Sequence, residues 1–181
     1  MRMTLQIELR GLEQDPGWQM DPAALALFCS AASVTFQGFH RSPEPGTVAH
    51  GATLHGASFA WDVADLRTQA THRNSDDATR DGAYAVAFAA LRRLGPYVFI
   101  HRALRKSGAD FVLAREGALD GPFIKLEVSG IGKGTDATVA RRLREKVKQV
   151  TRTASEEQGL AVVVRFARPH VAVEEVAVGL P

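Results

Sequence analysis

The sequence has few of the features that assign a protein to a class directly. Its single cysteine, Cys29, excludes an intrachain disulfide framework and an all-cysteine zinc site. Its longest apolar run, residues 83–91, is far shorter than the ~20 residues of a membrane span. Residues 1–15 hold no apolar secretory core, and neither sign of charge is in large excess, since the formal net charge is +2. We therefore expect a soluble protein of the reducing cytoplasm that has no membrane partner.

What the sequence does contain is the composition and patterning of a globular α/β domain. With 45% apolar and 23% charged residues, the 181-residue chain can bury a core without disulfides or structural metal. From residue 75 onward the hydrophobic periods predict a mixed central sheet with helices on its faces. The expected elements are a helix at 75–93, strands at 97–103, 110–114 and 123–129, a helix at 135–153, and strands at 160–166 and 171–176.

Residues 1–70 are expected to form a strand-rich α+β extension that packs on a core of residues 71–181 within one compact domain. The patterns in the extension are shorter and more often interrupted by proline and glycine. They indicate strands at 4–9, 33–39 and 53–63, a short helix at 21–28, and a loop at 40–46.

One face of the extension is unusually apolar. Phe59, Trp61 and Val63 alternate along their predicted strand and would share that face. A small extension does not easily cover such a face, and exposed apolar patches commonly mark interfaces. We therefore expect residues 30–65 to bind a protein partner or a second copy of the chain.

Two acidic residues in neighbouring predicted strands form the strongest candidate site. Asp110 begins one strand, and alternation in the next places Lys125, Glu127 and Ser129 on one face. Carboxylates from adjacent strands can hold Mg²⁺ or Mn²⁺, which orients a phosphate and activates an attacking water. A lysine beside them could neutralise the charge that develops. The structural alternative makes Asp110 a turn residue and Glu127 an exposed neighbour of Lys125.

This arrangement resembles the PD-(D/E)xK superfamily of restriction-endonuclease-like nucleases. Their shared core of a helix, a three-strand meander, a helix and a further strand matches residues 75–176. The resemblance implies that Asp110 is the first acid and Glu127 the second, that Mg²⁺ or Mn²⁺ is the cofactor, and that the protein belongs to a prokaryotic defence or restriction system. The family has a lysine two residues after the second acid, where this chain has Ser129. Lys125, two residues before Glu127, is the candidate replacement.

A basic run at 141–152 suggests contact with nucleic acid. Arg141, Arg144 and Lys148 would line one face of the second long helix, and Lys133 precedes that helix. Phosphate backbones favour such a surface, although a solvated helix exterior has the same pattern. A second basic cluster follows the first core strand and consists of His101, Arg102, Arg105 and Lys106.

Several alternatives stay open at this point. A relative that has kept the fold without catalysis would serve as an assembly or interaction subunit. The glycine-rich loop at 130–134 could instead hold an anion or nucleotide, although its spacing does not match a phosphate-binding loop. Asp77 and Asp81, four residues apart on the first long helix, could add a further acid to the site.

Overall fold

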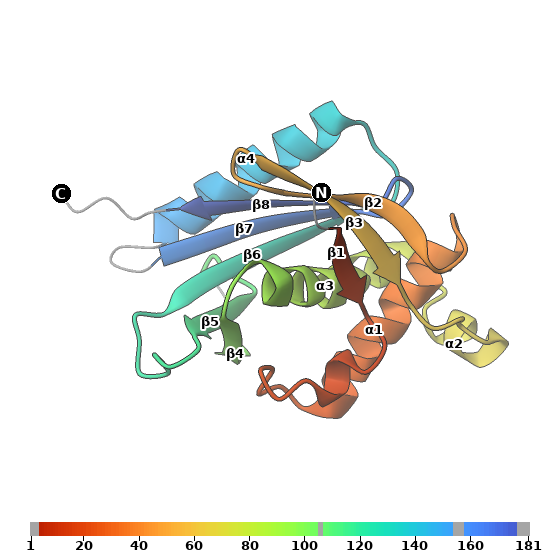
Figure 1. Ribbon diagram of the computed structural model, residues 1–181, viewed down its shortest axis with the longest axis horizontal. Coiled ribbons are helices and arrows are strands. Elements are labelled where there is room, and N and C mark those ends of the chain that lie inside the picture. Colours follow the sequence, from red (N-terminus) through yellow and green to blue (C-terminus); the bar gives the residue numbers. More distant parts are fainter. Residues whose placement is uncertain (1–3, 105–106, 154–157, 177–181) are drawn as a thin grey trace.

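In the computed structural model, which describes residues 4–104, 107–153 and 158–176, the chain forms one mixed eight-stranded sheet with helices on both faces. The strand order across this sheet is β1-β3-β2-β8-β7-β6-β5-β4 (Figure 1). The strands are β1 (Leu5–Glu8), β2 (Glu44–His50), β3 (Thr53–Ala60), β4 (Tyr97–Arg102), β5 (Phe111–Arg115), β6 (Ile124–Ile131), β7 (Gln158–Arg165) and β8 (His170–Val176). The helices are α1 (Pro22–Gln37), α2 (Leu66–Thr71), α3 (Ser75–Leu94) and α4 (Asp136–Thr153), with a short 3-10 turn at Leu12–Gln14.

The predicted core of residues 75–176 is confirmed element by element. After α3, strands β4, β5 and β6 form an antiparallel meander. The chain then crosses through α4 to β7, which is parallel to β6, and returns in β8, which is antiparallel to β7. Helix α4 packs on one face of the sheet against β6, β7 and β8, and α3 packs on the other. The arrangement predicted from the hydrophobic periods is therefore present, with strand ends shifted by one or two residues.

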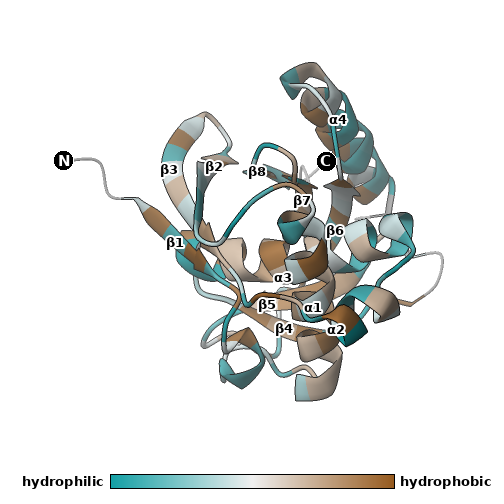
Figure 2. Cartoon of the chain, turned by 90° about the vertical axis from the view of Figure 1, so that its right-hand side faces the viewer, coloured by the Kyte–Doolittle hydropathy of each residue, from teal (hydrophilic) through white to brown (hydrophobic). Residues whose placement is uncertain are grey.

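Helix α3 is buried on nearly all sides, as its sequence predicts, because α1 covers the side that the sheet leaves open. The two helices approach closely at Gly82, where a Cβ atom would come within 2.7 Å of the Ala32 Cα atom. The helix begins after Asn74, whose Oδ1 accepts hydrogen bonds from the amides of Asp76 and Asp77. In Figure 2, α3 lies between the sheet and α1 and carries long brown, hydrophobic stretches.

The predicted strand at residues 33–39 is wrong: most of that segment is the second half of α1. The helix begins as expected, with the Asp21 carboxylate accepting from the Ala23 amide at 2.8 Å and a proline at the first position. It continues because Phe36 is fully buried, stacked on Trp61 with ring centroids 4.6 Å apart and packed on Phe166 at 4.7 Å. Packing between distant segments thus overrides a local alternation typical of a strand.

The expected loop at 40–46 is also partly wrong, because β2 begins at Glu44. Strand β2 forms a hairpin with β3 and is parallel to β8. The first 70 residues therefore contribute β1, β2 and β3 to the same sheet as the core strands.

The apolar face that suggested a protein partner through residues 30–65 is largely covered within the chain itself. Phe59 and Trp61 are each only 1% exposed, beneath Phe36 of α1. Val63 follows the end of β3 and is 79% exposed, so it does not continue that face. The apolar surface from which a partner interface was predicted is therefore mostly buried within the chain. None of the helices in the described ranges is long and apolar enough to cross a bilayer.

Candidate functional site

Asp110 is held in place by three hydrogen bonds at the point where β5 begins. Its backbone amide donates to the carbonyl of Leu126 at 2.9 Å, and its Oδ2 accepts from the Val128 amide at 2.9 Å. Its Oδ1 accepts from the Tyr84 hydroxyl of α3 at 3.2 Å. Burial, together with the nearby Asp110 carboxylate, raises the pKa of Tyr84, so Tyr84 remains a protonated donor. The carboxylate is therefore fixed between the sheet and α3.

Strands β5 and β6 separate just beyond this point. Their ladder covers only Phe111–Leu113 against Ile124–Leu126, whereas β6 pairs with β7 along its whole length to Ile131. At the next position of the ladder, the Val128 amide donates its hydrogen bond to the Asp110 side chain instead of to a backbone carbonyl of the neighbouring strand. The second half of β6 is therefore left to border a cleft on its β5 side.

Glu127 lies on the opposite face of β6 from Leu126 and Val128, toward α4. Its side chain is 5% exposed, and its Oε1 is 2.5 Å from the Nζ atom of Lys146 on α4. Burial raises the pKa of Glu127, the Asp110 charge adds to this increase, and the hydrogen bond from Lys146 opposes it. Glu127 is therefore paired with Lys146, and the Asp110 charge affects its pKa.

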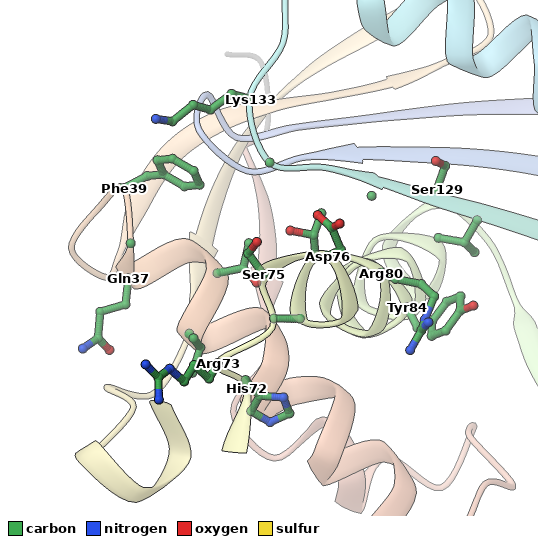
Figure 3. Close-up of a pocket in the computed structure, with 18 of the residues that line it drawn as sticks. Gln37, Phe39, His72, Arg73, Ser75, Asp76, Arg80, Tyr84, Ser129 and Lys133 are labelled. Carbon is green, nitrogen blue, oxygen red and sulfur yellow. The ribbon is translucent and has the colours of Figure 1, made fainter. Parts of the chain in front are cut away.

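A cleft of about 1150 Å³ opens beside these residues, between β6 and the loop after it on one side and α1 and α3 on the other. Figure 3 shows the cleft, with Tyr84 and Ser129 at one end and Phe39 and Lys133 at the other. Asp110 and Lys146 also line it, whereas Glu127 lies outside the lining. Asp110 and Lys146 thus belong to the cleft, and Glu127 is linked to it through Lys146.

The close approach of α3 to β6 along this cleft depends on a glycine. A Cβ atom at Gly130 would clash with the backbone carbonyl of Thr79 on α3. Part of the glycine-rich loop at 130–134 is therefore explained by packing. Gly132 and Lys133 of this loop line the cleft. Anion binding by the loop stays a prediction.

The structure separates the other residues predicted from the sequence. Ser129 lines the cleft next to the acids, whereas Lys125 is half-buried and does not line it. Lys133 lies at the far end of the cleft, with its Nζ atom 5.6 Å from the centre of the Phe39 ring. Arg141, Arg144 and Lys148 are exposed on α4 outside the cleft, where Arg141 forms an ion pair with Glu145 at 2.8 Å.

The proposed further acids are not in the cleft either. Arg80 contacts both of them, with Nη1 3.1 Å from Asp77 Oδ1 and Nε 2.9 Å from Asp81 Oδ1. Asp76 lines the cleft instead. Neither Asp77 nor Asp81 lines the cleft, and both carboxylates are paired with Arg80, so their role in the site stays a prediction.

Lys146 was missed as a site residue, although the sequence contains a signal for it. It lies seven residues after Val139 and four before Val150, both buried against the sheet. A charged residue in the apolar stripe of a helix needs a buried counter-charge, and Glu127 supplies it. Tyr84 had no comparable signal, since it lies within a continuously apolar helix.

The donor set is compatible with a hard divalent cation. Within the described ranges, no group of three or more His, Cys, Asp or Glu side chains is arranged to hold a metal. Mg²⁺ does not require one, because it commonly keeps several waters and uses one or two carboxylates together with substrate phosphates. Asp110 and Glu127 are the carboxylates that would hold it here.

No protein-family model, curated protein or solved structure matches this chain.

Proposed function

We propose that this protein is a divalent-metal-dependent phosphodiesterase that acts on nucleic acid, in the manner of PD-(D/E)xK nucleases. The observation that carries the proposal is that Asp110 and Lys146 line one cleft, with Glu127 paired to Lys146 behind it. The surrounding helix, three-strand meander, helix and strand have the order that the resemblance requires. Lys146, reaching in from α4, takes the place of the lysine that is absent at Ser129.

Each residue has a distinct role in this proposal. A bound Mg²⁺ or Mn²⁺ would supply an activated water and a counter-charge for the phosphate. Asp110 and Glu127 would hold that ion, and the Val128 amide and Tyr84 hydroxyl orient the Asp110 carboxylate for it. Lys146 would move from Glu127 toward the scissile phosphate, where its ammonium group offsets the developing charge.

The charges around the cleft suit a polyanionic substrate. Arg73, Lys133 and Lys146 all line the cleft, and cations at such positions attract phosphate backbones. The exposed basic residues on α4, Arg144 and Lys148, lie outside the cleft and would add contacts to more distant phosphates.

The proposal is tested by cleavage of labelled DNA and RNA, single-stranded and duplex, with millimolar Mg²⁺ or Mn²⁺. We expect Asp110→Asn, Glu127→Gln and Lys146→Met each to lower the cleavage rate by about 100-fold or more, since each removes a group acting on the transition state. Arg142→Met is the matched control, because it removes a cation from the same helix outside the cleft. Cleavage that survives all three site substitutions, or none by the wild type on any substrate, would refute the proposal.

A second candidate is supported by the same ion pair. The Lys146 ammonium lies 2.5 Å from Glu127 and already neutralises it, as it would in a subunit that keeps the fold for assembly alone. Titration calorimetry with Mn²⁺ separates the two candidates. The nuclease predicts heat of binding that is lost in Glu127→Gln, and the assembly subunit predicts identical traces for both proteins.

A further inference from the structure

We infer that the cleft takes single-stranded polynucleotide, with Phe39 as a stacking platform for an unpaired base and Lys133 beside it as a phosphate contact. This inference rests on the proposed function, because it defines the substrate class of the same site. Its basis is the far end of the cleft, which the metal chemistry does not use.

The far end is chemically distinct from the end that holds Asp110. Phe39 follows the end of α1 and is 36% exposed, so it is not committed to the core. The Nζ atom of Lys133, from the loop after β6, lies over the ring, 5.6 Å from its centre, so a base takes the other face of the ring or displaces the lysine. Figure 3 shows the two side chains next to each other, with Arg73 on the same side of the cleft. An exposed aromatic ring next to a cation is the combination that binds a base and its phosphate together.

The distance between the two ends fits a short stretch of strand. Ser75 and Tyr84 both line the cleft and are nine residues apart on α3, which at 1.5 Å per residue is about 13 Å. Successive nucleotides of a stacked strand rise about 3.4 Å along its axis, so this length corresponds to about four stacked nucleotides. A base on Phe39 and a phosphodiester at Asp110 can therefore belong to the same strand.

The strand must be unpaired for two reasons. Stacking on Phe39 requires a base whose face is uncovered, and the base faces of a duplex cover one another. In addition, Asp110 lies recessed between β6 and α3, with Glu127 only 5% exposed behind it. A flexible strand can reach these groups, whereas the broad surface of a duplex meets the rims of the cleft first.

Charge within the cleft directs the backbone toward its two ends. Figure 3 shows Lys133 and Arg73 toward the far end, Arg80 toward the end with Tyr84, and Asp76 between them; Lys146 also lines the cleft. A polyanion is therefore attracted at two points rather than uniformly. This pattern favours a strand that is gripped on either side of its middle nucleotides.

The test measures binding apart from cleavage, by fluorescence anisotropy without divalent metal. The probes are labelled oligothymidylate and oligouridylate, which separate DNA from RNA, and a duplex of the same length. We expect Phe39→Ala to weaken single-strand affinity about 5- to 100-fold, the range for loss of one stacked base, with duplex affinity unchanged. Phe39→Trp should keep or strengthen the binding, which excludes misfolding as the cause. Leu54→Ala, which removes another exposed apolar side chain far from the cleft, is the matched control.

A small substrate distinguishes this inference from the proposed function. Bis(p-nitrophenyl) phosphate has a phosphodiester but no strand to reach Phe39, so Phe39→Ala should cleave it at the wild-type rate while Asp110→Asn does not. If Phe39→Ala leaves single-strand affinity unchanged, or weakens duplex binding equally, the inference fails whether or not the wild type is a nuclease. If single-strand binding depends on Phe39 but the wild type cleaves neither substrate, the binding cleft stands and the proposed chemistry fails.

Discussion

Replacing Lys146 by methionine tests the central pair of the site through stability, independently of any activity. Methionine keeps the length of the side chain and its packing on α4, so the main loss is the ammonium group 2.5 Å from Glu127. Removing one partner of a buried ion pair typically costs about 3–5 kcal/mol, because the other charge stays buried without compensation. The lysine and glutamate side chains are only 18% and 5% exposed, so solvent screens this pair weakly.

The stability lost in the Lys146→Met variant should increase as the pH rises. Burial already raises the pKa of Glu127 above its usual value, and without the opposing effect of Lys146 it rises further. A carboxyl whose pKa is higher in the folded state stabilises the fold below its unfolded pKa, and that contribution is lost as pH rises through the folded pKa. The Lys146→Met variant should therefore approach wild-type stability under acid conditions and fall furthest below it on the alkaline side.

Urea unfolding followed by tryptophan fluorescence measures this effect, because Trp18 and Trp61 are both buried. With a urea slope of about 2–3 kcal/mol per molar, a loss of about 3–5 kcal/mol lowers the midpoint by about 1–2.5 M. Glu127→Gln combined with Lys146→Met should recover much of the loss, since neither charge is then left unpaired. Glu145→Gln, which breaks the exposed pair with Arg141, should cost about 0.5 kcal/mol or less. The reasoning would be refuted if Lys146→Met lowered the free energy of unfolding no more than Glu145→Gln does, or by an amount independent of pH.

Three further substitutions probe the fold and the basic surface. Gly130→Ala forces a Cβ atom against the Thr79 carbonyl, so it should cost about 1–3 kcal/mol and lower the midpoint of thermal unfolding by about 2–12 °C. Phe36→Ala should cost about 3–5 kcal/mol in urea unfolding, because the fully buried ring holds α1 to the sheet. Lys148→Ala should reduce the slope of log affinity against log salt for duplex DNA by about one, which anisotropy at several salt concentrations would show, and an unchanged slope would make this residue part of a solvated face only.

The core of residues 75–176 could be predicted from the sequence because its elements are marked locally. Helix α3 begins at a polar cap and continues into an apolar run, and the turns between its following strands contain glycine or proline. The N-terminal half lacks such signals. The segment 33–39 alternates like a strand, and only the contact of Phe36 with Trp61 and Phe166 makes it helical. Contacts between residues so distant in sequence cannot be deduced from local periodicity.

The same distinction applies to the site. Asp110 and Glu127 could be predicted because each has a defined position relative to a strand. Their surroundings could not, because the Tyr84 hydroxyl and the Lys146 ammonium come from helices on opposite faces of the sheet. The choice of Lys125 as replacement lysine followed strand alternation alone. Lys146 reaches Glu127 only because α4 packs across β6, which no spacing within the strand reveals.

Lys146 has either a catalytic or a structural role, and its position next to Glu127 suggests a measurement that distinguishes the two. Its ammonium group occupies a position next to Glu127 that a divalent cation would also need, so the two cations compete for one carboxylate. In an enzyme, a bound metal ion would displace Lys146 toward the substrate, and Lys146→Met should then bind Mn²⁺ at least as tightly as the wild type while losing cleavage. In an assembly subunit the lysine is a permanent substitute for the metal, and its removal should weaken the fold without changing any response to Mn²⁺. The affinity of this one variant for Mn²⁺ therefore distinguishes a catalytic lysine from a structural one.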